Sequence, residues 1–164
     1  MKFFLGVILV GAMSVPARAD VSSVQRAVHK IDAAKMPVTT TSRSDLSAEG
    51  AEITVYGNPK APRKITARVF GCSFQTHERL YFQDGLPLFF FSVEEFYDGP
   101  LSPPVRVAHR VETRLYFEHG HVMQQRIGRR VVALNAAQKV ALEREVSGLA
   151  GLYGMDGADK REER

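Results

Sequence analysis

The sequence predicts an α+β fold, in which an antiparallel β-meander of about six strands packs against an N-terminal and a C-terminal helix. Near both ends of the chain, apolar residues recur at spacings of three and four, which is typical of amphipathic helices. From residue 51 onward, short apolar alternations are separated by turn residues, which is typical of antiparallel strands. Because an amphipathic helix must cover an apolar surface, we expect both helices to pack on the sheet. An open sandwich without helix cover is the alternative.

The first 19 residues have the three parts of a secretory signal peptide. Lys2 gives a positive start, and Phe3–Val15 is an apolar run that is short for a membrane span. Small residues then stand at Ala17 and Ala19. We expect cleavage between Ala19 and Asp20, a periplasmic or secreted location, and no stable membrane insertion afterwards. Removal of 19 residues from 164 leaves 145, which suffices for a single domain.

Charge and cysteine content narrow the class of partner. The chain has 22 Lys and Arg against 18 Asp and Glu. The signal peptide takes Lys2 and Arg18, which leaves 20 basic residues and a net charge of +2, so we expect no nucleic-acid partner. Cys72 is the single cysteine, so no disulfide forms within the chain, and we expect its thiol to be buried in an oxidising compartment.

The N-terminal part, residues 20–48, is predicted to be a helix and a linker. An apolar stripe indicates a helix from about residue 22 to residue 35. Ser22 with Gln25 has the spacing of a capping box. Residues 39–44 are polar and β-branched, and we interpret them as a flexible connector.

The C-terminal helix is predicted from about residue 136 to residue 150, with Asn135 and Gln138 as its cap. Residues 49–153 would then hold the sheet and this helix, in a single domain with the N-terminal helix. Residues 154–164 are polar and charged, and we predict a disordered tail there.

Two strand–turn–strand units in the meander share one sequence pattern. Arg79-Leu80-Tyr81-Phe82 recurs 35 residues later as Arg114-Leu115-Tyr116-Phe117, and Gly85 recurs as Gly120. Asp84-Gly85 is a dipeptide suited to a tight hairpin. The repeat predicts two adjacent hairpins that use the same packing solution.

These two runs, of the form Arg-Leu-Tyr-Phe followed by a turn with glycine, resemble segments of many uncharacterised exported bacterial proteins. In those proteins an aromatic strand, an Asn-Gly or Asp-Gly turn and a returning strand follow one another. The resemblance covers about residues 51–127. It implies an antiparallel sheet and no particular activity.

Histidines supply the candidate chemistry. His109 interrupts an apolar row between Val107 and Val111, so we expect it to be partly buried. As a general base it would need a carboxylate neighbour, and the candidates on the preceding strand and loop are Glu94, Glu95 and Asp98. A structural role for His109 is the alternative.

A metal site is the second possibility that the histidines raise. His119 and His121 alternate on a strand, as zinc ligands can. The repeat, however, places His119 at the turn position of Asp84, where positive φ is needed. It also places His121 across from Glu118, as a surface acid–imidazole pair. We therefore expect no metal there, and the absence of a glycine-rich phosphate loop predicts no cofactor.

A strand face with arginine beside tyrosine is the candidate binding surface. Arginine pairs with carboxylates and other anions through a planar fork of donors. Glu78, Glu112 and Glu118 are expected on the same face, where cross-strand pairing would explain the arginines without a ligand. The candidate binding residues are Arg106, Arg110, Arg114, Tyr81 and Tyr116.

The function expected from these features is that of an exported, non-catalytic binding module for a protein, a peptide or an envelope component. A small hydrolase or isomerase built around His109 is the first alternative. The second is a self-associating structural component, a homodimer for example, with the apolar strand around Phe89-Phe90-Phe91 as the interface.

Overall fold

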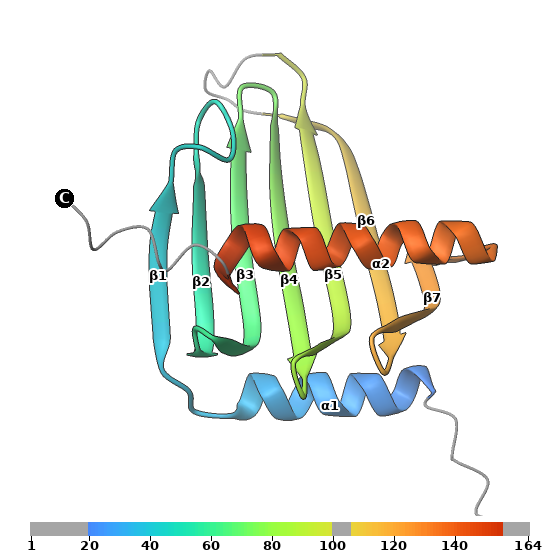
Figure 1. Ribbon diagram of the computed structural model, residues 1–164. Coiled ribbons are helices and arrows are strands. Elements are labelled where there is room, and N and C mark those ends of the chain that lie inside the picture. Colours follow the sequence, from blue (N-terminus) through green and yellow to red (C-terminus); the bar gives the residue numbers. More distant parts are fainter. Residues whose placement is uncertain (1–19, 100–105, 156–164) are drawn as a thin grey trace, which may run out of the picture.

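A single antiparallel sheet with two helices forms the fold in the computed structural model, which describes residues 20–99 and 106–155 (Figure 1). The predicted α+β class and antiparallel meander are confirmed, with eight strands instead of about six. The elements are α1 (Val21–Ala33), β1 (Val38–Arg43), β2 (Ala51–Asn58), β3 (Ala61–Gly71), β4 (Phe74–Gln83), β5 (Leu86–Tyr97), β6 (Val107–Glu118), β7 (His121–Ile127), β8 (Arg130–Val132), α2 (Ala136–Ala150) and the π-helical turn η1 (Gly151–Met155).

Strand order in the sheet follows the chain from β1 to β8, and every neighbouring pair is antiparallel. The predicted connector at residues 39–44 is wrong, because β1 occupies most of it and pairs with β2. β1 escaped the pattern because it is a largely exposed edge strand rich in threonine. Its Thr40 hydroxyl lies 3.1 Å from that of Thr54 on β2. The other additional strand, β8, comes from the predicted last strand, which the turn after Ile127 divides in two.

The two helices cover opposite faces of the sheet, and the alternation of side chains along the strands explains why. On β4, Leu80 and Phe82 point to the face that α2 crosses, while Tyr81 between them points to the face that holds α1. Figure 1 shows α2 across the middle of the sheet and α1 along the end where the β4–β5 and β6–β7 turns lie. The larger core therefore lies beneath α2 and a smaller one beneath α1.

Helix ends agree with the prediction at α2 and differ at α1. Asn135 and Gln138 form the predicted capping box, with both hydrogen bonds at 2.9 Å. The cap of α1 is Asp20, whose carboxylate accepts the Ser23 N–H at 2.6 Å, in place of the predicted Ser22 with Gln25. Within the described ranges, neither helix has the length and hydropathy that a membrane span requires.

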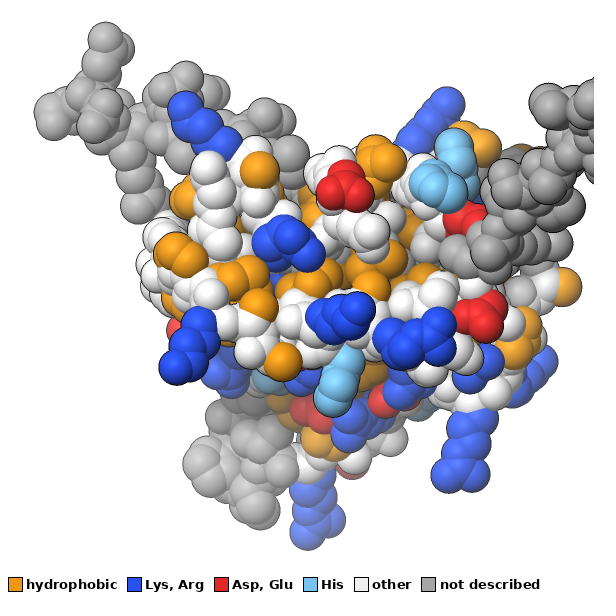
Figure 2. Space-filling view, turned by 90° about the horizontal axis from the view of Figure 1, so that it is seen from below, with side chains coloured by type: hydrophobic (Ala, Val, Ile, Leu, Met, Phe, Trp, Pro, Cys, Tyr) orange, Lys and Arg blue, Asp and Glu red, His pale blue; other side chains and the backbone are white. Residues whose placement is uncertain are grey.

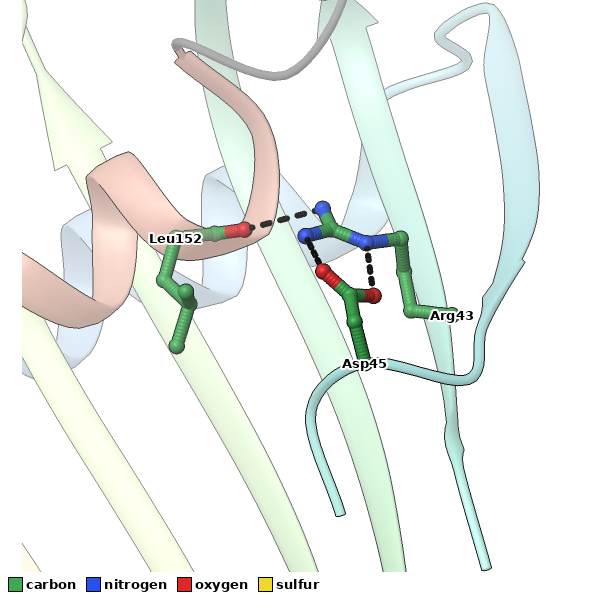
Figure 3. A network of polar contacts seen from close by, with 3 residues as sticks. All are labelled: Arg43, Asp45 and Leu152. Carbon is green, nitrogen blue, oxygen red and sulfur yellow. Dashed lines mark hydrogen bonds and ion pairs between the residues drawn. The ribbon is translucent and has the colours of Figure 1, made fainter.

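Arg43 ties the first strand to the end of the last helix (Figure 3). Its guanidinium donates two hydrogen bonds to Asp45, at 2.7 and 2.6 Å, and a third at 3.2 Å to the carbonyl oxygen of Leu152 in η1. Tyr153, the next residue, is buried in the larger core. Gly154, predicted to begin the disordered tail, lies instead within η1. The rest of the predicted tail and the predicted signal peptide up to Ala19 lie outside the described residues.

Turn geometry matches the repeat. Asp84 and His119 have φ of 53° and 51°, and the glycine after each is also left-handed. The predicted burial of Cys72 is wrong: it is exposed, because it stands in the two-residue turn between Gly71 and Phe74 that joins β3 to β4.

Candidate binding face

Part of the sheet face that holds α1 is left open by this helix. The residues beneath α1 include Tyr81 and Tyr116, near one end of β4 and β6. Towards the other end of these strands, the same face presents arginines and aromatic rings. We call this open part the arginine face and define it by the side chains of Arg68, Arg79, Phe91, Arg110, Arg114 and Arg126.

One row of the arginine face runs straight across four strands. Arg79 on β4 is the cross-strand partner of Phe91 on β5, which is the partner of Arg114 on β6, which is the partner of Arg126 on β7. The guanidinium carbons of Arg79 and Arg114 lie 5.5 and 5.2 Å from the centroid of the Phe91 ring. One aromatic ring thus attracts two cations and keeps both guanidiniums close to it.

Carboxylates form ion pairs with some of the arginines of the arginine face, while other arginines there have no carboxylate partner among the described residues. Glu112 pairs with Arg114, while Glu95 lies 3.9 Å from Arg110 and Glu52 lies 3.8 Å from Arg68. Within residues 20–99 and 106–155, neither Arg79 nor Arg126 forms an ion pair with a carboxylate. Arg126 donates to the Gln124 amide oxygen at 3.2 Å, and its guanidinium carbon lies 5.8 Å from the Tyr116 ring centroid. Two guanidiniums in the same row therefore keep uncompensated charge.

The structure brings together some of the predicted binding residues. Arg110 and Arg114 share the arginine face as expected, and Arg106 is exposed just before β6. Tyr81 and Tyr116 point to the same face, but both are 2 % exposed beneath α1 and are not available as surface ligands. Residues that the prediction missed are Arg126 and Phe91, which enter the row only through the cross-strand register.

The buried tyrosine has a structural role of its own. The Tyr81 hydroxyl lies 3.1 and 3.2 Å from the two carboxylate oxygens of Asp32 on α1, and Lys64 lies 2.7 Å from the same carboxylate. Burial, followed by the charge of Asp32, raises the pKa of Tyr81 to about 12. Tyr81 is thus a neutral donor that helps to hold α1 on the sheet.

Glu78 is the clearest correction to the predicted face. It stands on β4 between Arg79 and His77, and its side chain points to the α2 face instead. Burial raises its pKa, and the hydrogen bond from Tyr153 acts in the opposite direction. Its cross-strand partner Ser92 is 3 % exposed. This buried polar pair was not predicted, because nothing in a single strand's pattern shows which face α2 would cover.

The arrangement proposed for catalysis is not assembled. His109 is exposed, contrary to the expectation, because α2 does not reach this end of β6. Its ring centroid lies 6.0 Å from that of Phe96, and within the described residues no hydrogen bond or ion pair joins it to a carboxylate. Glu95 points to the opposite face and faces Arg110. Glu94 shares the face of His109, two residue pairs further along the ladder, where its partner is Val111.

Asp98 is linked to the chain near His109 through its backbone. Its N–H donates to the Arg106 carbonyl oxygen at 3.0 Å. A shallow depression beside His109, of about 620 Å³, is lined by both faces of β6 and by the β7–β8 turn. It is open to solvent along the sheet edge, so it offers no enclosed site for a reaction.

The other two predicted histidines are turn and surface residues. His119 takes the left-handed turn position, and His121 is the cross-strand partner of Glu118, both as predicted from the repeat. The side chain paired with His121 is that of Glu143 on α2, at 3.4 Å. Across the described ranges, no group of three or more His, Cys, Asp and Glu side chains has the geometry of a metal site.

Phe89-Phe90-Phe91, proposed as a self-association strand, makes its contacts within the chain. β5 is paired on both sides, with β4 and β6. Phe90 is buried in the larger core, and the Phe89 ring lies between those of Tyr81 and Tyr116, at 5.8 and 5.1 Å.

No protein-family model, curated protein or solved structure matches this chain.

Proposed function

We propose that this chain is an exported, non-catalytic binding module that recognises an anionic protein, peptide or envelope component through the arginine face. The observation that carries the proposal is the row from Arg79 through Phe91 and Arg114 to Arg126. Its two outer guanidiniums have no carboxylate partner among the described residues. Phe91 lies within cation–π distance of both Arg79 and Arg114, which restricts the two guanidiniums to its vicinity before a ligand arrives.

The spacing of the row fits a ligand with more than one anionic group. Adjacent strands are about 4.8 Å apart, so Arg79 and Arg126, three strands apart, are separated by about 14 Å. Carboxylates and phosphates both accept paired hydrogen bonds from a guanidinium. A ligand with two anionic groups at about this spacing would engage both uncompensated arginines at once.

The test is a pair of charge reversals that leaves the core untouched. Arg79→Glu with Arg126→Glu is compared with Arg130→Glu plus Arg144→Glu, two exposed arginines outside the arginine face. Poly-glutamate and polyphosphate are the probes, measured by calorimetric titration at low and at physiological salt. We expect the first variant to lose at least tenfold in affinity for one of the probes and the second to bind as the wild type does.

Two results would overturn the proposal. In the first, the wild type binds neither poly-glutamate nor polyphosphate, and the Arg79→Glu, Arg126→Glu variant captures the same envelope proteins as the wild type. The other is an equal loss in both double variants, which would show that total charge alone decides binding. Thermal unfolding of each variant establishes that the sheet remains folded.

A further inference from the structure

A second basic surface lies at the end of the molecule formed by α1 and the neighbouring turns. We call it the underside and define it by the exposed side chains of Arg26, His29, Lys30 and Lys35 on and after α1 and of Lys60 in the β2–β3 turn. Figure 2 looks onto this end and shows more Lys and Arg side chains than Asp and Glu, with hydrophobic side chains between them.

The basic residues of the underside are not neutralised by nearby acids. Asp32, the acidic residue within α1, is held by Lys64 and by the Tyr81 hydroxyl. Asp20 caps the start of α1 and accepts the Ser23 N–H, while Asp84 and Glu118 lie at the β4–β5 and β6–β7 turns. Among the described residues, no ion pair joins a carboxylate to Arg26, Lys30, Lys35 or Lys60, so the outer side of α1 keeps its positive charge.

Apolar side chains protrude at the same end. Leu86, at the start of β5, is 47 % exposed, and Val38, at the start of β1, is 55 % exposed. Between α1 and the two turns lies a pocket of about 350 Å³, whose walls include Val24, Leu88 and Phe117. Protruding apolar groups beside a band of cations match the layering of an anionic bilayer, with charged headgroups over an apolar interior.

We infer that the underside docks this protein onto a membrane surface rich in anionic phospholipid. The α1 helix, 13 residues long, would lie along the surface for about 20 Å at 1.5 Å per residue. Its apolar stripe is already buried against the sheet, so α1 does not enter the bilayer; its cations contact headgroups while Leu86 and Val38 reach the interface.

Cosedimentation with vesicles tests the inference on protein recovered from exporting cells, with its N-terminal residue fixed by mass spectrometry. Vesicles of pure phosphatidylcholine are compared with vesicles that contain phosphatidylglycerol. A basic residue near an anionic surface contributes about 1 kcal/mol, and reversal of its charge adds repulsion, so Arg26→Glu, Lys30→Glu and Lys35→Glu together should weaken partitioning by at least about 100-fold. Leu86→Asn should weaken it further without changing its salt dependence.

A matched triple variant, Arg129→Glu, Arg130→Glu and Arg144→Glu, alters the same total charge away from the underside. It should retain binding to vesicles, as should the Arg79→Glu, Arg126→Glu variant of the arginine face. Three results overturn the inference: no preference of the wild type for phosphatidylglycerol, unchanged binding by the underside variant, or an equal loss in the matched triple. Circular dichroism melting confirms that each variant is folded.

Discussion

Glu78 of β4 and Ser92 of β5 are cross-strand partners beneath α2, and each has one buried side-chain oxygen that no described residue hydrogen-bonds. Burial raises the pKa of Glu78, and the charges of Glu94 and Glu145 raise it further, against the opposing hydrogen bond from Tyr153. The folded protein therefore binds a proton at Glu78 more tightly than the unfolded chain does.

This pKa shift predicts that Glu78 makes the protein less stable as pH rises. Below the unfolded-state pKa, near 4.5, both states are protonated and the group has no net effect. Between that pH and the raised folded-state pKa, only the unfolded chain ionises, so the free energy of unfolding falls; above the folded-state pKa it stays low. Glu78→Gln removes this dependence and should stabilise the fold at pH 7.5 by about 1 kcal/mol.

Urea unfolding at pH 4.5 and pH 7.5 measures the effect. The wild type should lose stability between the two pH values relative to Glu78→Gln. Glu52→Gln, an exposed carboxylate on β2 that does not contribute to the pKa shift of Glu78, serves as the control. A Glu78→Gln variant that is less stable than the wild type at pH 7.5 would show that the ionised carboxylate is structurally required.

Glu143 should contribute more to the free energy of unfolding than His121, the histidine with which it pairs. Its Oε1 accepts the Val122 backbone N–H at 2.8 Å, which joins α2 to β7 in a partly buried position. A hydrogen bond to a charged group contributes about 1.5–3 kcal/mol, so Glu143→Ala should lower the free energy of unfolding by about this amount. His121 is largely exposed, and His121→Ala should leave stability almost unchanged.

Chemical denaturation of the two single variants and the double variant measures both residues and their coupling. Equal losses for Glu143→Ala and His121→Ala would contradict the assignment, since they would locate the stabilisation in the ion pair. Zinc added to the wild type should leave the melting temperature unchanged.

Local sequence signals predicted the features that depend on a few neighbouring residues. The cap at Asn135, the left-handed turn at His119 and the alternation along β6 were all predictable, because each follows from backbone conformation within a few residues. β1 could not be predicted in this way, because an exposed edge strand needs no apolar stripe. It is held instead by backbone pairing with β2.

Alternation within a single strand predicted only part of the arginine face. Alternation placed Arg110 and Arg114 on one face, but only the register across β5 and β7 adds Phe91 and Arg126 to their row. Likewise, the position of α1 decides that Tyr116 is buried, and the extent of α2 decides that His109 is exposed. Both depend on tertiary packing of helices that lie far from these strands in sequence.

The thiol of Cys72 is open to solvent because this residue stands in the β3–β4 turn. A hydrogen bond with Glu49 and the charge of that carboxylate raise the pKa of the Cys72 thiol. Because the thiolate is the reactive form, the folded protein should react with a disulfide reagent at one thiol per chain, but slowly at pH 7.5 and faster as pH rises.

Replacing Glu49 distinguishes the effect of solvent exposure on the reactivity of the Cys72 thiol from the effect of its pKa. Glu49→Gln removes the charge and should speed the reaction at pH 7.5 severalfold, with its pH profile shifted to lower pH, while Glu52→Gln on β2 should react as the wild type does. The rates are measured by absorbance without denaturant. A thiol that reacts only after unfolding would contradict its exposed position, and identical profiles for Glu49→Gln and the wild type would show that Glu49 does not set its pKa.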